Sequence, residues 1–328
     1  MNTYKQIEAA IKSASNIVIT AHKSADGDSI GSSLGLLYFI ERLGKKATIC
    51  HPDKAPGFLY WLDTSSILLM DETPDEVANK IAEADLIFCL DYNAISRVGA
   101  DMQLLLEVSE AQKIMIDHHQ APDDYSTYMF SDVSMSSTCE MIYHFLDMLD
   151  ATDKIDTNIA TCLYVGIMTD TGSFRFKSTT STTHKIIAEL IEKGADNSEI
   201  HNNVYDTNSY EGLQLLGCAL SNLRVIPEHK TAYISLSQDE LQKFNYKKGD
   251  TEGVVNYGLS LKNVVLAAIF IEDRKEGIIK LSLRSKGDFS VNEMSRKHFN
   301  GGGHTNAAGG KSFKSLKETI EDFISILP

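Results

Sequence analysis

The sequence predicts an α/β protein with an N-terminal, doubly wound, mainly parallel sheet, a helical connector and a smaller C-terminal α/β domain with a mixed sheet. Two patterns predict this class. In the first half, near-continuous apolar runs alternate with segments of helical spacing, which is typical of a parallel sheet covered on both faces. After Pro227 a second series of apolar strands begins, and a chain of 328 residues is longer than one hydrophobic core ordinarily supports.

The first half contains four short apolar runs that predict buried strands. They lie at 16–20, 47–50, 86–90 and 113–116. Helical spacing follows at 29–44 and at 74–84, where Pro74 suits a first-turn position. An amphipathic helix is expected at the N-terminus, and further helices at 138–150 and 156–168.

The second half predicts a connector and then a separate domain. Residues 181–222 keep helical spacing but are more polar. We therefore expect a metal-binding domain over 1–190, a helical connector over 191–224 and a substrate-binding domain over 225–328. In the last of these, strands are predicted at 231–236, 264–272 and 277–285, helices near 290–298 and 315–326, and one short strand within 311–315.

Composition restricts the class of partner. The 31 Lys and Arg against 45 Asp and Glu give a net charge of −14, which argues against gripping long duplex or single-stranded nucleic acid. A short nucleotide bound at a metal centre stays compatible, because cations there supply positive charge. The five cysteines form no CxxC pair, and no signal peptide or membrane-length apolar run is present. We therefore expect a soluble cytoplasmic protein without a membrane partner.

Polar residues follow the predicted strands and one apolar helix, where ligands of open α/β sheets gather. They are His22, Asp26, Asp28, Asp91, Asp117, His118, His119 and Asp170. Each alone has an ordinary explanation, since such an Asp often caps a helix or forms a turn, and a single His often lies in the core or on the surface. Together they offer imidazole and carboxylate donors that divalent cations such as Mn²⁺ accept.

These segments resemble a known family. HKSADGDS, LDYN, IDHH and MTDTG resemble the four metal motifs of the DHH phosphoesterase superfamily, and SSTCEMIY resembles a further segment of it. GGGH followed by AAGG is similar to the substrate-binding signature of the DHH-associated C-terminal domain. The resemblance covers nearly the whole chain. The departures, Ser24-Ala25 and Thr305 where prolines or a lysine are common, affect no metal ligand.

The resemblance implies a role for each residue. His22, Asp26 and Asp91 would hold one divalent cation, and Asp28, Asp91, His118 and Asp170 the other, so that Asp91 bridges them. The catalytic residues would be Asp91, His119, which faces the phosphate, and Asp117, which orients a histidine. The cations would be Mn²⁺, with Mg²⁺ or Co²⁺ as alternatives.

The C-terminal signature implies the substrate. Arg284 would pair with a phosphate, and Gly301, Gly302, Gly303 and His304 would hold a phosphate or base. The chain looks most like the nanoRNase-type branch of the family, whose members use a metal-activated water to hydrolyse very short oligoribonucleotides to mononucleotides and to convert pAp to AMP. Hydrolysis of a cyclic dinucleotide or pApA, a RecJ-like single-strand exonuclease and a non-catalytic nucleotide-binding module are the alternatives. The resemblance also suggests a homodimer.

Overall fold

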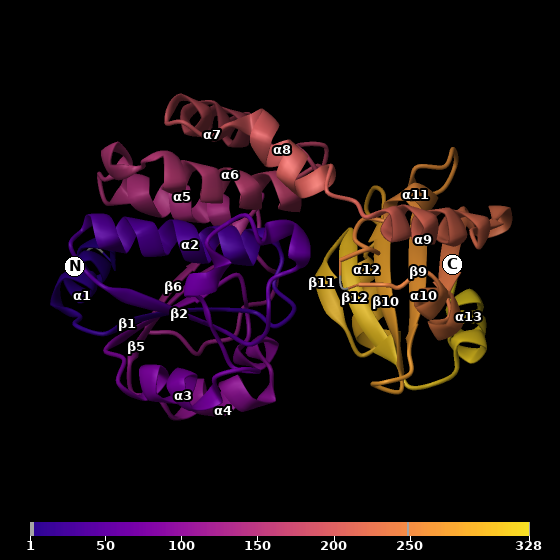
Figure 1. Ribbon diagram of the computed structural model, residues 1–328, viewed down its shortest axis with the longest axis horizontal. Helices are drawn as coiled ribbons and strands as arrows, with labels where there is room; N and C mark the ends of the chain where they lie inside the picture. Colours follow the sequence, from indigo (N-terminus) through magenta and orange to yellow (C-terminus); the bar gives the residue numbers. More distant parts are fainter. Residues whose placement is uncertain (1–2, 248, 328) are drawn as a thin grey trace. The chain divides into compact units, whose positions relative to one another are not determined.

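The computed structural model describes residues 3–247 and 249–327. The chain divides into two compact units, Met1–Thr207 and Asn208–Pro328 (Figure 1). The segment expected as a connector is shared between them: α8 (Asn197–Tyr205) belongs to the N-terminal unit and α9 (Tyr210–Ser221) to the C-terminal unit.

The N-terminal unit contains a six-stranded sheet in the order β3-β2-β1-β4-β5-β6, in which every neighbouring pair is parallel. Its strands are β1 (Ile17–Ala21), β2 (Ala47–His51), β3 (Leu68–Leu69), β4 (Leu86–Leu90), β5 (Gln112–Asp117) and β6 (Tyr128–Ser131). The four predicted strands are confirmed. The sequence missed β3 and β6, because one has two residues and the other is a half-exposed edge strand without a continuous apolar run.

Helices cover both faces of this sheet, as a doubly wound fold requires. They are α1 (Thr3–Ser13), α2 (Gly27–Arg42), α3 (Pro74–Ala82), α4 (Ala100–Val108), α5 (Thr138–Met148), α6 (Thr157–Asp170) and α7 (Ser181–Glu192). One face carries α1, α2 and α5, with α6 packed outside α2 and α5 and α7 packed outside α6, and the other face carries α3 and the unpredicted α4 (Figure 1).

Two glycines let α2 and α6 pack closely. A Cβ atom at Gly31 would lie 2.4 Å from the carbonyl oxygen of Cys162, and one at Gly166 would lie 2.8 Å from Asp28 Oδ1. Neither site has room for a side chain. The backbones of α2 and α6 can therefore lie this close only because both positions are glycine. The close packing brings the start of α2 beside the end of α6, and both ends carry candidate ligands.

The C-terminal unit contains a mixed sheet in the order β11-β12-β10-β9-β8-β7, with one parallel pair, β8–β9. The strands are β7 (Arg224–Ile226), β8 (Thr231–Leu236), β9 (Leu266–Asp273), β10 (Ile278–Ser285), β11 (Gly302–His304) and β12 (Ala307–Ser312), and the helices after α9 are α10 (Gln238–Lys243), α11 (Val255–Leu259), α12 (Val291–His298) and α13 (Leu316–Ser325). The mixed sheet is confirmed, and β7, α10 and α11 were not predicted.

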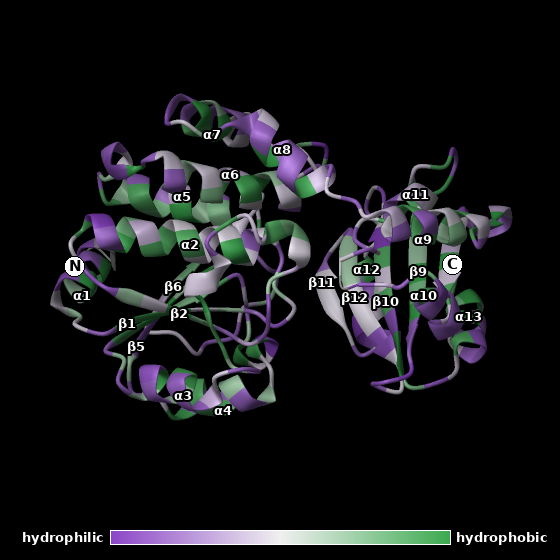
Figure 2. Cartoon of the chain, viewed as in Figure 1, coloured by the Kyte–Doolittle hydropathy of each residue, from purple (hydrophilic) through white to green (hydrophobic). Residues whose placement is uncertain are grey.

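One prediction in this unit was misplaced and one strand was missed. The short strand expected within 311–315 is β12, which begins earlier and ends at Ser312, and β11 within the glycine run was not predicted. Both strands consist largely of glycine, alanine and polar residues, and they are mostly pale in Figure 2. They lack the apolar alternation on which strand prediction depends.

Two further predictions concern the surface and the cysteines. No helix in the described part of the chain is long and apolar enough to cross a bilayer. All five cysteines are free thiols, and the four in apolar segments are buried (Cys50, Cys89, Cys139 and Cys162).

Candidate metal centre

The candidate ligands come together because their strands are neighbours. The sheet places β1, β4 and β5 side by side and parallel, so their C-terminal ends lie on one edge. His22 follows β1, Asp91 follows β4, and Asp117 is the last residue of β5, with His118 and His119 directly after it. The edge predicted from the sequence is therefore the edge at which these side chains meet.

Asp91 is the centre of this cluster. It lies just beyond β4 with φ +62°, a left-handed conformation that Asp adopts more readily than most residues, and its amide still donates to the Ile116 carbonyl. Its Oδ2 is 3.3 Å from His22 Nε2, and its Oδ1 is 3.6 Å from His118 Nε2. The two oxygens of one carboxylate thus face two different histidines.

The first group contains His22, Asp26 and Asp91, whose donor atoms lie within 4.8 Å of one another. Asp26 caps α2 by accepting the amides of Asp28 and Ser29 through Oδ1, while its Oδ2 lies 3.6 Å from His22 Nε2. One side chain therefore both starts the helix and reaches the histidine.

The second group contains Asp28, Asp91 and His118, with Asp170 beside it. His118 Nε2 lies 3.7 Å from Asp28 Oδ2 and 3.4 Å from Asp170 Oδ2. Asp28 comes from the first turn of α2 and Asp170 is the last residue of α6, so the glycine-mediated packing of these helices sets their separation.

The donor set fits divalent cations. The Nδ1 atoms of His22 and His118 approach the carbonyl oxygens of Lys23 and Met135, which can only accept. Each Nδ1 therefore keeps a proton, and Nε2, which faces the carboxylates, is the atom that can bind a cation once its own proton is lost. The separations of 3.3–3.7 Å are long for hydrogen bonds. They are close to the distance of about 3.0–3.4 Å expected between two ligands that each bind one cation at about 2.1 Å.

The N-terminus of α5 holds the carboxylates in place. The amides of Thr138 and Cys139 donate to Asp28 Oδ2 and Oδ1 at 2.6 and 2.8 Å, and the Thr138 hydroxyl donates to Asp91 Oδ1 at 3.0 Å. Buried Glu140 accepts from the Ser136 amide and hydroxyl and lies 3.1 Å from the Thr183 hydroxyl. Sequence reasoning gave Thr138 and Glu140 no role, although the serine- and threonine-rich segment that contains them was noticed.

His119 has a different environment. Its Nδ1 donates to Asp117 Oδ1 at 2.7 Å, and its amide donates to Asp117 Oδ2 at 3.1 Å. Asp117 is fully buried and therefore fixes the ring. His119 Nδ1 also lies 3.6 Å from Asp91 Oδ1, but its proton is directed at Asp117, so Nε2 is the ring nitrogen that can meet a substrate.

Burial and charge separate the three histidines. Burial opposes the charge on His22, but the Asp26 and Asp91 carboxylates outweigh it and raise the pKa of His22 to about 10. Burial also opposes the charge on His118, but Asp170, Asp28 and Asp91 raise its pKa to about 9. For His119, burial and then the positive charge of Arg97 hold the pKa well below the ordinary value. Arg97 was not among the predicted site residues.

Cation binding should therefore release protons. At neutral pH the raised pKa values keep His22 and His118 protonated in the metal-free protein, so each cation must displace a proton. We expect apparent Mn²⁺ affinity to rise with pH up to about pH 10 and to fall in acid. Calorimetric titration in two buffers of different ionisation enthalpy measures the released protons, and a heat independent of the buffer would contradict this expectation.

Thr138→Val should weaken cation binding without unfolding the protein. The substitution removes the hydroxyl that donates to Asp91 but keeps the shape of the side chain and the α5 amides. Loss of such a supporting hydrogen bond costs about 10- to 100-fold in metal affinity or activity. Thr138→Ser, which retains the hydroxyl, is the matched control, and equal Mn²⁺ affinity in both variants would show that the hydrogen bond is unimportant.

In the C-terminal unit, the predicted substrate residues lie on neighbouring strands. Arg284 on β10 pairs with Ala307 on β12, and His304 on β11 pairs with the same Ala307. Gly303 has φ +145°, and a Cβ atom there would lie 2.4 Å from the Ala307 carbonyl oxygen, so this hairpin requires glycine. The register therefore places Arg284 and His304 at one level of the sheet.

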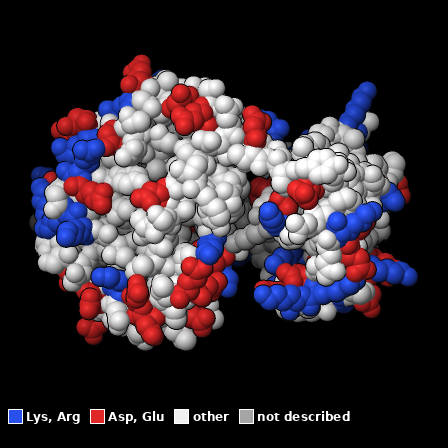
Figure 3. Space-filling model, viewed as in Figure 1, with Lys and Arg blue, Asp and Glu red and all other residues white. Residues whose placement is uncertain are grey.

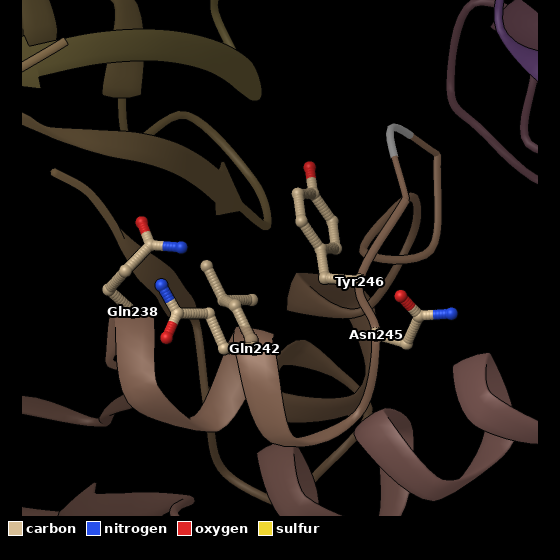
Figure 4. A pocket seen from close by; sticks show the side chains of 5 residues that line it. Gln238, Gln242, Asn245 and Tyr246 are labelled. Carbon is tan, nitrogen blue, oxygen red and sulfur yellow. The ribbon is translucent and has the colours of Figure 1, made fainter. Parts of the chain in front are cut away.

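A separate hollow of about 230 Å³ lies beside α10 (Figure 4). Gln238 and Gln242 present their amides from successive turns of the helix, with Asn245 and Tyr246 on the following turn. It contains no carboxylate, imidazole or thiol among its lining residues and thus no candidate for acid–base or metal chemistry.

Comparisons with known proteins identify the family. Residues 16–167 match the model of the DHH family, N-terminal domain, and residues 230–327 match the DHHA1 domain. The chain belongs to the DHH family.

Relatives extend the match over the whole chain. The chain is 32% identical over 322 residues to a "Probable bifunctional oligoribonuclease and PAP phosphatase NrnA" of Streptococcus mutans, covering 97% of this chain and 96% of that protein. It is 30% identical to the NrnA protein of Bacillus subtilis, covering 89% and 88%. A crystal structure of an exopolyphosphatase-related protein from Bacteroides fragilis, 40% identical, superposes with a TM-score of 0.94 over 99% of this chain and 95% of that one.

Proposed function

We propose that this protein is a metal-dependent phosphoesterase that hydrolyses very short oligoribonucleotides to mononucleotides and removes the 3′-phosphate of pAp. The observation that carries the proposal is the Asp91 carboxylate, whose two oxygens face the two histidine-containing donor groups. The named activities of the Streptococcus and Bacillus relatives supply the substrate class.

Two divalent cations, with Mn²⁺ as the first candidate, would bind in the two donor groups. His22, Asp26 and Asp91 would hold one, and Asp28, Asp91, His118 and Asp170 the other. When bound, such a pair activates water and neutralises phosphoryl oxygens. Because these groups come from four separate segments of the chain, the site exists only in the folded N-terminal unit.

The remaining residues act on the substrate. His119 points Nε2 at the phosphate or leaving oxygen and donates to it when the ring carries a second proton, which the negative charge of a bound phosphate favours. The buried Asp117 keeps the ring in that orientation. Arg97, whose positive charge lowers the pKa of His119, stabilises the same phosphate. In the C-terminal unit, Arg284 pairs with a substrate phosphate, and His304 with Gly301–Gly303 binds a phosphate or base.

A side-by-side turnover assay tests the proposal. RNAs of two to five nucleotides, pAp, pApA and long single-stranded DNA are incubated with the protein and Mn²⁺ or Mg²⁺. We expect rapid hydrolysis of the short RNAs and pAp and little of the long DNA. Preferential hydrolysis of long DNA or of a cyclic dinucleotide would contradict the proposed substrate class.

Variants of the C-terminal residues separate substrate binding from metal binding. Arg284→Ala and His304→Ala should raise KM for pAp and dinucleotides about 10-fold or more, since each removes a charge-assisted contact. Cation content, measured by elemental analysis after gel filtration, should stay unchanged. Loss of cations in either variant would contradict the assignment of these residues to substrate.

A further inference from the structure

One face of the C-terminal sheet is only partly covered. On β10, Ile279, Leu281 and Leu283 are buried against α12 and α13, so the alternate residues face the other way. On that second face, the described core residues come from β8 and β9 and from α9–α11, and none from β10 or β12. The outward residues of β10 and β12 are half-buried or exposed.

The strand register aligns the outward residues in rows. Arg284 pairs with Ala307, Ser282 with Gly309, and Lys280 with Lys311. Directly paired residues of antiparallel strands point to the same face, and rows two residues apart are separated by about 7 Å. Two lysines therefore lie about 14 Å along the sheet from the arginine assigned to the substrate.

No large side chain stands on the outward side of β12 between the arginine row and the lysine row. A Cβ atom added at Gly309 would meet only the Leu281 carbonyl oxygen, at 3.7 Å, and Ala307 carries one methyl group. By contrast, a Cβ atom at Gly310, which faces inward, would lie 2.9 Å from Phe299. The outward side of β12, from Ala307 through Gly309 to Lys311, is thus a strip without bulky side chains that ends at the lysine pair Lys280 and Lys311.

An exposed aromatic ring follows the lysines. Phe313, just after β12, is 68% exposed, and Lys311 Nζ lies 5.7 Å from the centre of its ring. An exposed aromatic ring beside a lysine ammonium group has the two features that proteins use to bind single-stranded nucleic acid, a surface for base stacking and a positive charge for the phosphate.

Charges in this unit favour an anionic ligand. Asn208–Pro328 contains 16 Lys and Arg against 14 Asp and Glu, whereas residues 1–207 contain 15 against 31 (Figure 3). On the strip, Lys280 also contacts Asp273 at 2.9 Å, but its side chain is 54% exposed. Exposed pairs of this kind are weak, so Lys280 can turn from Asp273 to a phosphate.

We propose that this strip binds the distal nucleotides of a short single-stranded oligonucleotide, with a phosphate at Lys280 and Lys311 and a base stacked on Phe313. The inference rests on the proposed function and deepens it. pAp and dinucleotides are too short to reach these residues from Arg284, whereas RNAs of four or five nucleotides reach them. Binding at the strip thus lets the protein hold longer oligonucleotides than it could hold through Arg284 alone.

Steady-state kinetics of the full-length protein with Mn²⁺ test the proposal on substrates of increasing length. Phe313→Ala should raise KM for a five-nucleotide RNA about 5- to 100-fold, the range for loss of one base–aromatic stack. The double variant Lys280→Gln/Lys311→Gln should raise KM for this RNA by a similar factor. It should also reduce the slope of log KM against log salt concentration by about 0.7 per lost phosphate contact. In both variants KM for pAp should change less than about 2-fold.

Matched controls lie elsewhere in the same unit. Lys317→Gln on α13 removes an 86% exposed lysine, and Tyr210→Ala on α9 removes a 73% exposed ring. Neither should alter KM for the five-nucleotide RNA. Equal effects of the strip and control variants, or equal effects of the strip variants on pAp and the longer RNA, would overturn the proposal.

Binding without turnover separates this proposal from the proposed function. Fluorescence anisotropy of a labelled five-nucleotide RNA is measured with the full-length protein in EDTA. Weaker binding by the strip variants supports the strip even if no RNA is hydrolysed in the turnover assay. Unchanged binding overturns it even if hydrolysis is rapid.

Discussion

Asp91→Ala is expected to abolish hydrolysis of pAp and short RNA, with a loss in kcat/KM of at least about 1,000-fold. The substitution removes the carboxylate that faces both His22 and His118, so both donor groups lose a ligand at once. The measurement is turnover at saturating Mn²⁺, together with circular dichroism to establish that the fold survives.

Asp91→Asn is the matched control for the backbone. Asp91 has φ +62°, a conformation that Asn tolerates and Ala does not favour. Asn therefore keeps the local structure but loses the negative charge. We expect Asn to be nearly as inactive as Ala. Substantial activity in the Asn variant would mean that Asp91 shapes the turn rather than binding cations.

His119→Asn is expected to lower kcat by about 100- to 10,000-fold, the range for loss of a positioned acid–base group. Its Nδ1 is committed to Asp117, and its pKa is held low by burial and Arg97, so the ring differs from the two metal-facing histidines. Cation content should therefore stay at the level of the unaltered protein. Loss of a cation would assign His119 to the ligands instead.

Asp117→Asn distinguishes positioning from direct participation. Asn keeps a carbonyl oxygen that can accept from His119 Nδ1 but removes the charge beside the ring. A smaller loss of kcat than in His119→Asn, with the acidic limb of the pH–rate profile displaced, is expected for a residue that acts through His119. An unchanged profile would leave Asp117 with a purely structural role.

Much of the N-terminal fold could be predicted because its signals are local. The strands β1 and β4 are buried throughout and nearly all apolar, and parallel strands of one sheet end on one edge. That rule, with the family resemblance, identified candidate ligands that the structure brings together around Asp91. The edge strands β3 and β6 lack such runs and were missed.

The remaining features depend on contacts between distant segments. Thr138 meets Asp28 and Asp91 from 110 and 47 residues away, so nothing beside Thr138 in the sequence announces its hydrogen bonds. The left-handed conformation of Asp91 also follows from the fold, because Asp in general is more often extended or helical. In the C-terminal unit, only the register of β10 and β12 brings Lys280 beside Lys311.

The number of cations bound per chain tests the central claim most directly. Elemental analysis or calorimetric titration with Mn²⁺ should give about two per chain for the unaltered protein. Asp26→Asn and Asp170→Asn, which each alter one donor group, should each retain one tightly bound cation, whereas Asp91→Asn should retain neither tightly. A single cation in the unaltered protein, or two in the Asp91 variant, would contradict a pair of cations that shares Asp91.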